Sequence, residues 1–258
     1  MPIVQGIYYT LYEGGQKDRP PVVLIHGAGS DHLCWPVELR RLSSHHVLAL
    51  DLPGHGRSSG LGLHSIDSYA GQVVGFLAGL DINQAYLVGH SMGGAIALSI
   101  SLQFPTLPVA LGLIASGAYL NVKPELLEAL KSPGTYQDGL NWIRQRAFSP
   151  HTGAALIEYS MKQLHAVRPA TLYEDWLACS RFDLHGKIEQ IEAPSWVAVG
   201  SDDRLTPLSC ANYLITSLRH ARLQVIPSAG HMLILEKPKE LAQGLQKFLK
   251  DVEAWHGI

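Results

Sequence analysis

Cysteine is scarce in this chain, with three residues among 258: Cys34, Cys179 and Cys210. Their number is odd, they lie far apart, and no Cys-x-x-Cys pair occurs. This spacing argues against both a disulfide framework and a structural zinc site. Small buried side chains are the ordinary role of such cysteines, so we expect no metal and a cytoplasmic location.

Charge of one sign and long apolar runs are also missing. The chain has 20 basic and 22 acidic residues, a net charge of −2, and no lysine or arginine cluster. Nucleic-acid backbones are bound by such clusters, so no nucleic-acid partner is expected. No segment approaches the roughly 18 uninterrupted apolar residues of a membrane span. Residues 1–6 also lack the basic and apolar regions that open a secretory signal.

Apolar, strand-like runs alternate with helical stretches along most of the chain. The runs cover residues 22–25, 47–50, 85–88, 109–115, 195–199 and 223–226, and a helix is predicted near 238–251. This alternation predicts an α/β fold, with a mostly parallel central sheet and helices on both faces. Ligands of such sheets bind beyond the carboxyl ends of the strands.

A serine follows one of these strands at a sharp turn. Ser91 stands between Gly89 and Gly93, after the strand at 85–88 and before a helix. This pattern predicts a nucleophile elbow, in which larger side chains at the two glycines would collide with their neighbours. The first N–H groups of the helix have no partner within it, so the N–H of Met92 is a candidate oxyanion donor. The alternative is an ordinary turn with an incidental serine.

A second loop supplies the other donor that acyl transfer requires. The strand at 22–25 ends in the run 26–30, where the N–H of Ala28 is the candidate. Gly27 and Gly29 also resemble a dinucleotide-binding turn, but His32 occupies the position of the third glycine. We therefore expect no cofactor.

Two later strands are followed by a carboxylate pair and a histidine. Asp202 and Asp203 follow the strand at 195–199, and His231 follows the strand at 223–226. One of the carboxylates is expected to orient the histidine, which would act as the base. The chain order of the candidate triad is therefore Ser, Asp, His.

The order Ser, Asp, His, with each residue just past a predicted strand, resembles the α/β-hydrolase superfamily. The resemblance is to its serine-nucleophile, carboxylesterase-like branch and covers nearly the whole chain. Residues 26–27, 51–58, 200–203, 230–231 and 236–238 resemble further motif segments of that superfamily. The resemblance places the triad carboxylate three residues after the glycine that ends the strand, at Asp203. Asp202 is then interpreted as a turn residue that helps to cap the next helix.

The resemblance also assigns non-catalytic roles to three residues in the motif loops. His90 is expected to pack beside the site, and His55 belongs to a structural turn with its two flanking glycines. Asp51 precedes Ser91 in the chain, so it is interpreted as a loop-stabilising carboxylate.

Between Gly117 and Ile188 the pattern changes to helices alone, predicted at 124–130, 136–148, 153–167 and 170–180. The resemblance implies a helical cap at 118–185, inserted into a core made of 1–117 and 186–258. Seven apolar side chains either line an acyl pocket or form ordinary helical core: Trp142, Phe148, Tyr159, Met161, Leu164, Tyr173 and Trp176. Four arginines either bind a substrate carboxylate or form a solvated face: Arg144, Arg146, Arg168 and Arg181.

The predicted function is hydrolysis of a small-molecule carboxylic ester through an acyl-enzyme on Ser91, with His231 as base and Asp203 orienting it. The N–H groups of Ala28 and Met92 would hold the oxyanion. A carbon–carbon bond hydrolase would use the same triad, although such relatives often carry an aromatic residue where Met232 follows the histidine. A cofactor-free haloperoxidase or perhydrolase, and a receptor without turnover, are further alternatives.

Overall fold

Eight strands form one sheet in the order β1-β2-β4-β3-β5-β6-β7-β8. The computed structural model describes residues 2–16 and 19–256, so the outermost residues of the predicted core segments lie outside it. The strands are β1 (Ile3–Val4), β2 (Ile7–Glu13), β3 (Val22–Ile25), β4 (His46–Leu50), β5 (Ala85–His90), β6 (Pro108–Ile114), β7 (Ser195–Gly200) and β8 (Ala221–Ile226). From β4 to β8 the pairing is parallel. The six predicted strands are present, whereas the antiparallel β1–β2 edge was not predicted.

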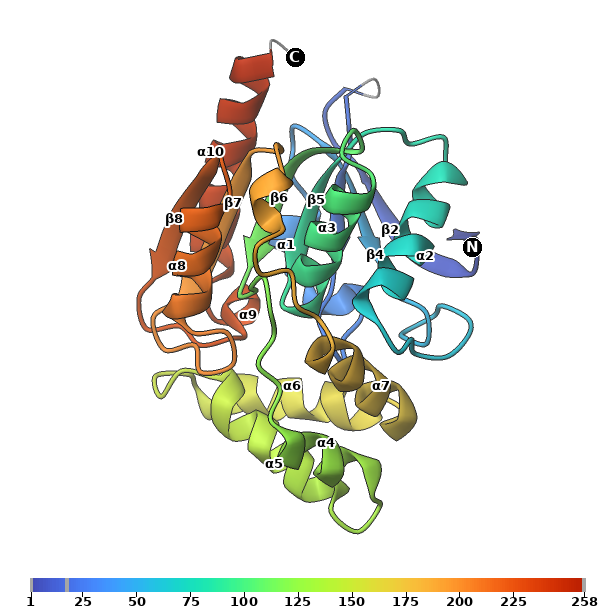
Figure 1. Cartoon of the computed structure of the whole chain (residues 1–258), viewed down its shortest axis with the longest axis vertical. Coiled ribbons are helices and arrows are strands. Elements are labelled where there is room, and N and C mark those ends of the chain that lie inside the picture. The colour runs from blue at the N-terminus through green and yellow to red at the C-terminus, as the bar shows by residue number, and fades with distance from the viewer. Residues whose placement is uncertain (1, 17–18, 257–258) are drawn as a thin grey trace.

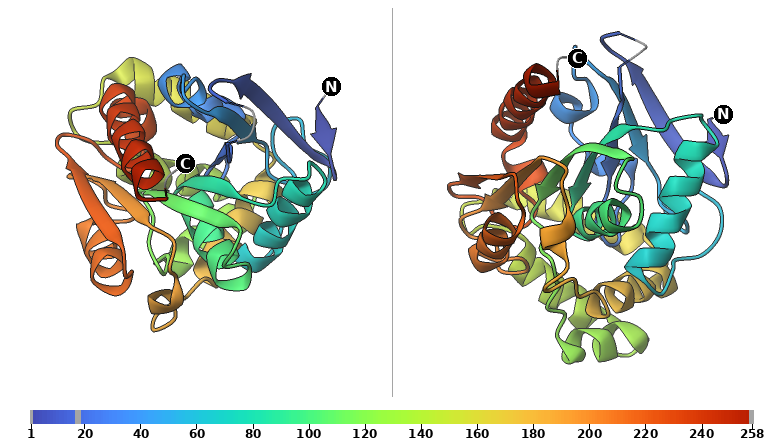
Figure 2. Two further views of the ribbon diagram at one scale, coloured as in Figure 1. Left: turned by 90° about the horizontal axis from the view of Figure 1, so that it is seen from above. Right: turned by 45° about the horizontal axis from the view of Figure 1, so that its top comes forward.

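Helices cover both faces of this sheet, as predicted (Figures 1 and 2). One face carries α1 (Val37–Arg40) and α10 (Pro238–His256). The other face carries α2 (Ile66–Ala78), α3 (Met92–Gln103) and α8 (Leu208–Ser217). Short turns of helix occur at η1 (His32–Cys34), η2 (Ile188–Gln190) and α9 (Leu233–Glu236).

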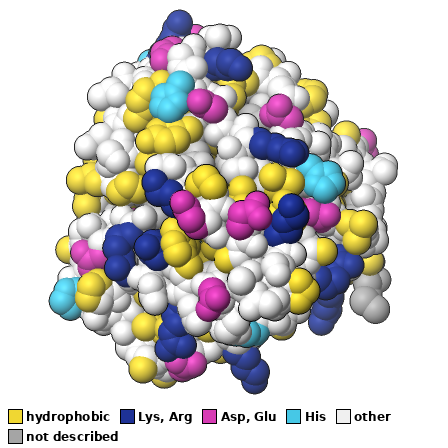
Figure 3. Space-filling model, turned by 60° about the horizontal axis from the view of Figure 1, so that its bottom comes forward, with side chains coloured by type: hydrophobic (Ala, Val, Ile, Leu, Met, Phe, Trp, Pro, Cys, Tyr) yellow, Lys and Arg dark blue, Asp and Glu magenta, His cyan; other side chains and the backbone are white. Residues whose placement is uncertain are grey.

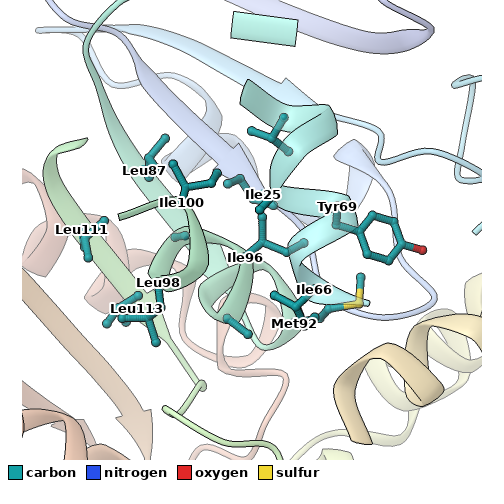
Figure 4. Close-up of a cluster of buried hydrophobic side chains, with 14 of the residues drawn as sticks. Ile25, Ile66, Tyr69, Leu87, Met92, Ile96, Leu98, Ile100, Leu111 and Leu113 are labelled. Atoms are coloured by element: carbon teal, nitrogen blue, oxygen red, sulfur yellow. The ribbon is translucent and has the colours of Figure 1, made fainter. Parts of the chain in front are cut away.

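The helix α3 lies at the centre of the larger apolar cluster. Residues 92–101 are all buried, which is typical of a helix that is apolar on every side. Figure 4 shows Ile96 and Ile100 of α3 among side chains of the sheet and of α2. Burial of each large apolar side chain contributes about 1.5–3 kcal/mol to the stability of the fold. The start of α3, directly after Ser91, is therefore held in a rigid environment.

Four helices lie between β6 and β7: α4 (Pro124–Lys131), α5 (Tyr136–Ala147), α6 (Ala154–Ala166) and α7 (Pro169–Ser180). Their bounds agree with the predicted ranges to within one residue. We call residues 124–180 the helical insertion. It gathers at one end of the sheet (Figure 1) and has an apolar core of its own, to which Leu126, Leu140 and Leu172 belong.

None of the helices in the described part of the chain combines the length and the apolar character that crossing a membrane requires. The end of the molecule that carries the helical insertion shows acidic, basic and apolar side chains interspersed (Figure 3). No charge of one sign dominates this face.

Candidate active site

Ser91 occupies a strained turn between β5 and α3. Its φ of 53° and ψ of −117° lie outside the regions that most residues adopt. The Ser91 N–H donates to the Ile114 carbonyl at 2.8 Å, and the Ser116 hydroxyl donates to the Ser91 carbonyl at 2.8 Å. These contacts hold the strained conformation that exposes the Ser91 hydroxyl.

The two glycines of the turn are required by close backbone approaches. A Cβ at Gly89 would lie 2.2 Å from the backbone of Gly93, and a Cβ at Gly93 would lie 2.0 Å from the Ile25 carbonyl oxygen. Real Cβ atoms do not approach that closely. The collisions predicted for larger residues at these positions are confirmed.

The three candidate triad residues meet at the carboxyl ends of β5, β7 and β8. The Ser91 Oγ lies 2.9 Å from the His231 Nε2, and the His231 Nδ1 lies 3.0 Å from the Asp203 Oδ2. Because the carboxylate accepts the Nδ1 proton, it holds the imidazole in the tautomer whose Nε2 can accept the serine proton. The arrangement can therefore transfer a proton from Ser91 to His231.

Asp203 is buried and hydrogen-bonded on both oxygens. Its Oδ1 accepts the N–H groups of Leu205 and Thr206 at 2.9 Å each, and its Oδ2 accepts the Thr206 hydroxyl at 2.8 Å. Burial opposes the charged form, but the electrostatic attraction to His231 and these hydrogen bonds outweigh it and lower the pKa of Asp203. The carboxylate is therefore ionised. Thr206 was not singled out from the sequence, although its place three residues after an aspartate is typical of side-chain-stabilised turns.

Asp202 differs from its prediction. It is half-buried, and its carboxylate accepts the Ser149 hydroxyl at 2.5 Å and the Ser201 hydroxyl at 3.0 Å. The next helix, α8, starts at Leu208, too far along the chain for this side chain to reach, and has no side-chain cap. The predicted helix cap is wrong, and Asp202 instead ties the loop of Asp203 to the helical insertion.

Neither the Ala28 N–H nor the Met92 N–H has an acceptor among the described residues. Met92 begins α3 directly after Ser91. The loop of Ala28 also touches the elbow, since a Cβ at Gly27 would lie 3.1 Å from the Ser91 Cβ. The two predicted donors thus belong to the residue that follows Ser91 and to a loop that touches the elbow, and their role as oxyanion donors stays a prediction.

A cavity opens in front of Ser91 and His231, between the core loops and the helical insertion. Five of the seven predicted apolar residues line it: Phe148, Tyr159, Met161, Leu164 and Trp176. Trp142 and Tyr173 pack against the insertion's own core instead. Leu33 and Tyr159 are about half exposed at this cavity (54% and 52%), so apolar surface extends from the cavity to the outside.

His90 and Asp51 have the supporting places that were predicted. The His90 Nε2 donates to the His231 carbonyl at 2.9 Å, and burial lowers the pKa of His90 to about 3, which keeps the ring neutral. Asp51 accepts the N–H and the Nδ1 proton of His32 at 2.7 Å and the N–H of Arg57 at 2.8 Å. Burial opposes its charge, but these bonds lower the pKa of Asp51.

No arginine in the described part of the helical insertion lines the cavity in front of Ser91. Arg144 pairs with Glu158, and Arg146 stacks over the ring of Trp142. Arg168 donates to the carbonyls of Gly54 and Gly60 at 3.0 Å each, and Arg181 donates to that of His64. These side chains hold the insertion together or attach it to the core.

Asp31, His32 and Asp51 are the described side chains whose ligand atoms lie close enough to hold a metal ion, within 4.8 Å of one another. The hydrogen bonds of Asp51 to His32 and Arg57 already occupy both of its oxygens, and Asp31 accepts the Leu33 N–H at 2.7 Å. The group is therefore better described as a hydrogen-bonded loop than as a metal centre.

Two carboxylates that connect the helical insertion to the site were missed. Glu236 accepts the Gly230 N–H at 2.7 Å and the Ser149 N–H at 2.9 Å. Asp175, on α7, is fully buried and accepts the Gly29 N–H at 2.8 Å. Glu236 lies in a segment quoted for the resemblance, whereas no signal in the sequence distinguishes Asp175 from other helical acidic residues.

Comparisons with known proteins identify the family of this chain. Residues 22–244 match the model of the Alpha/beta hydrolase family. The chain is 32% identical to the dihydrolipoyllysine-residue acetyltransferase component of an acetoin cleaving system from Pseudomonas putida, over 96% of this chain and 68% of that one. It is 26% identical to the uncharacterized hydrolase YugF of Bacillus subtilis (95% and 94%) and 33% identical to the solved structure of a thermophilic esterase (96% of each chain, TM-score 0.82). The chain belongs to the alpha/beta hydrolase family.

Proposed function

We propose that the protein is a serine hydrolase that cleaves carboxylic esters through an acyl-enzyme intermediate. The observation that carries the proposal is the continuous chain of hydrogen bonds from the Ser91 hydroxyl through His231 to Asp203. That chain ends at a cavity where two N–H groups have no acceptor among the described residues. The similarity of this protein to a thermophilic esterase supports the same reaction class.

In the first half of the reaction His231 takes the Ser91 proton at Nε2 while the Ser91 oxygen bonds to the ester carbonyl carbon. The carbonyl oxygen becomes an anion, which the N–H groups of Ala28 and Met92 stabilise. Each such donor contributes roughly 3–4 kcal/mol in the transition state. The imidazolium then protonates the leaving alcohol, the carbon–oxygen bond of the ester breaks, and the acyl group stays on Ser91.

In the second half water replaces the alcohol. His231 takes one proton of the water while the hydroxide oxygen bonds to the acyl carbon, and the same oxyanion site is used again. The proton then returns to Ser91 as the bond to the acyl group breaks. The products are the free acid and the regenerated serine, and no cofactor takes part.

We also propose that residues 118–185 act as the cap of this hydrolase. Apolar side chains of the insertion face Ser91 across the cavity, which suits an apolar acyl group. Half-exposed Leu33 and Tyr159 beside them allow a longer apolar chain to extend outwards. The preferred substrates are therefore esters with an apolar acyl group.

The test is hydrolysis of p-nitrophenyl esters, from acetate to laurate, by the wild type, by Ser91→Ala and by Ser209→Ala. Ser209 is an exposed serine at the start of α8 and is the matched control for the loss of a hydroxyl. We expect Ser91→Ala to lose about 10⁴-fold or more in kcat and Ser209→Ala to keep the wild-type rate. Equal rates for the wild type and Ser91→Ala, or no hydrolysis by either, would remove the ester-hydrolase proposal.

A further inference from the structure

The loop that carries the candidate donor Ala28 is held at two successive peptide groups. The first is the peptide between Gly27 and Ala28, whose carbonyl oxygen lies 2.8 Å from the His26 Nδ1. The His26 Nε2 accepts the Leu52 N–H at 3.0 Å, so its proton is on Nδ1 and is donated to the Gly27 carbonyl. This bond orients the peptide unit that also contains the Ala28 N–H.

The second fixed peptide lies between Ala28 and Gly29, and its partner comes from the helical insertion. The Gly29 N–H donates to the Asp175 Oδ2 at 2.8 Å, across 146 positions of the chain. Gly29 has a φ of +62°, and a Cβ there would lie 2.5 Å from the Leu172 Cδ1, so α7 packs directly on this turn. The Asp175 carboxylate therefore binds the loop at Gly29, the residue that follows the candidate donor Ala28.

Asp175 is itself held by two further buried side chains. Its Oδ2 accepts the His55 Nε2 proton at 2.8 Å, and its Oδ1 accepts the Tyr69 hydroxyl at 2.5 Å. All three side chains are at least 97% buried. Burial disfavours a charged imidazole, but the charge of Asp175 and its hydrogen bond outweigh this and raise the pKa of His55. Both ring nitrogens of His55 lie beside acceptors, the Pro53 carbonyl at 3.0 Å and Asp175, and this arrangement favours the charged ring that would offset the buried carboxylate.

A carboxylate suits this position better than a neutral side chain. Three donors converge on its two oxygens: the Gly29 N–H, the His55 Nε2–H and the Tyr69 O–H. An ionised carboxylate accepts on both oxygens, whereas an amide has one accepting oxygen and would turn an NH₂ group towards a donor. The site is thus built for an anion, although no ligand or reacting atom touches it.

We propose that Asp175 is a positioning residue for the oxyanion site: by accepting the Gly29 N–H it keeps the Ala28 N–H aimed at the oxygen that becomes charged. The inference rests on the proposed function. It means that the helical insertion does more than line the cavity, because it supplies the acceptor that fixes part of the catalytic backbone. The core contributes the other support through His26.

The experiment compares Asp175→Ala, Asp175→Asn and Leu126→Ala with the wild type. Four quantities are measured: kcat and KM for a p-nitrophenyl ester, the affinity for a trifluoromethyl ketone, and the thermal midpoint. The ketone adds to the serine and places an oxyanion in the site, so its affinity reports the position of the donors. Leu126 is buried in the insertion's core away from the cavity, so Leu126→Ala controls for loss of stability alone.

We expect Asp175→Ala to lose about 10- to 100-fold in kcat, as a donor misplaced by a fraction of an ångström would. The affinity for the ketone should fall in proportion, while KM stays nearly unchanged. Asp175→Asn keeps one oxygen that can face Gly29 and should recover part of both losses. Leu126→Ala should lower the thermal midpoint and keep kcat and ketone affinity near the wild-type values.

Two results would overturn the inference. One is an Asp175→Ala variant with a lower thermal midpoint but wild-type kcat and ketone affinity. The other is Leu126→Ala losing as much kcat and ketone affinity as Asp175→Ala at an equal loss of stability, which would assign Asp175 a merely structural role. Hydrolysis by the wild type and its loss in Ser91→Ala are established first, so that a failure of the proposed function is recognised separately. If the proposed function fails, the inference about Asp175 fails with it.

Discussion

Ser91, Asp203 and His231 each lie in a loop or turn that follows a core strand, whereas the opposite wall of the cavity comes from helices α5 to α7 of the insertion. In the core, the sheet hydrogen bonds fix the strand ends, and short loops present the side chains. The insertion is attached to these loops mainly by polar side chains, such as Asp175, Arg168 and Glu236. The comparison teaches that, in the proposed enzyme, the reacting groups lie at rigid strand ends, while substrate fit and fine positioning depend on long-range side-chain contacts.

The largest expected effect comes from breaking the core turn itself. In Gly93→Ala the new Cβ would meet the Ile25 carbonyl oxygen at 2.0 Å, so the strand end or α3 must move. We expect a loss of about 3 kcal/mol or more in the free energy of unfolding and no detectable hydrolysis. Gly71→Ala is the matched control, because this exposed glycine of α2 has open space around it. Gly71→Ala should gain about 0.4–1 kcal/mol in the free energy of unfolding. Chemical denaturation measures this free energy for both variants. A Gly93→Ala variant that is stable and active would contradict the nucleophile elbow.

The second prediction separates the two neighbouring carboxylates. Asp203→Asn should lower kcat by about 10⁴-fold, because the amide no longer holds the His231 tautomer that accepts the serine proton. Asp202 contacts Ser149 of the insertion and not His231, so Asp202→Asn should change kcat by no more than a few-fold. Steady-state kinetics on one p-nitrophenyl ester measures both. If Asp202→Asn were the more damaging substitution, Asp203 would not be the triad acid.

The third prediction concerns the loss of stability in acid that two buried histidines cause, His26 just after β3 and His90 at the end of β5. Burial lowers the pKa of His26 to about 4 and that of His90 to about 3, against 6.5 in the unfolded chain. The stability that the two neutral rings contribute is present above pH 6.5 and is lost as the pH falls towards 4, because the unfolded state takes up the protons. Each group adds a slope of about 1.4 kcal/mol per pH unit in that range.

Chemical denaturation at several pH values between 4 and 7 measures this slope. His90→Asn removes one of the two groups and should reduce the slope near pH 5 by about 1.4 kcal/mol per unit. An unchanged slope in this variant would mean that His90 is not kept neutral by its burial against His231.

The smallest effect is expected at the attachment of the insertion. Arg168 donates to the carbonyls of Gly54 and Gly60, so Arg168→Ala should cost about 1 kcal/mol in stability and raise KM a few-fold while kcat stays near the wild-type value. Arg144→Ala removes an exposed pair with Glu158 and is the control, with a loss of at most about 0.5 kcal/mol. A large fall in kcat for Arg168→Ala would show that the insertion acts on the chemistry through this contact too.

Much of the core could be predicted because its signals are contiguous in the sequence. The elbow around Ser91, the acid loop and the histidine loop each combine a strand, a glycine and a reactive side chain within about ten residues. The helices of the insertion were also found, because proline and glycine mark their ends. The edge pair β1–β2 was missed, since its strands face solvent on one side and carry no motif.

The rest depends on contacts between residues that are distant in the chain. Asp175 meets Gly29 and His55 only after α7 packs against the core, and no local pattern separates it from the neighbouring Glu174. The same holds for Trp142 and Tyr173, which share their helical spacing with residues that do line the cavity but turn towards the insertion's core. Sequence periodicity gives the apolar face of a helix, but not which part of that face meets a cavity.

The central claim is that Ser91 carries the acyl group during turnover. The most direct test mixes the enzyme with a p-nitrophenyl ester, stops the reaction with acid within milliseconds, and measures the mass of the intact protein. The account predicts a burst of p-nitrophenol equal to the enzyme concentration and a mass increase of one acyl group, located on the peptide that contains Ser91. Ser91→Ala should show neither. Turnover without any acylated protein, or an acyl group on another residue, would contradict the account.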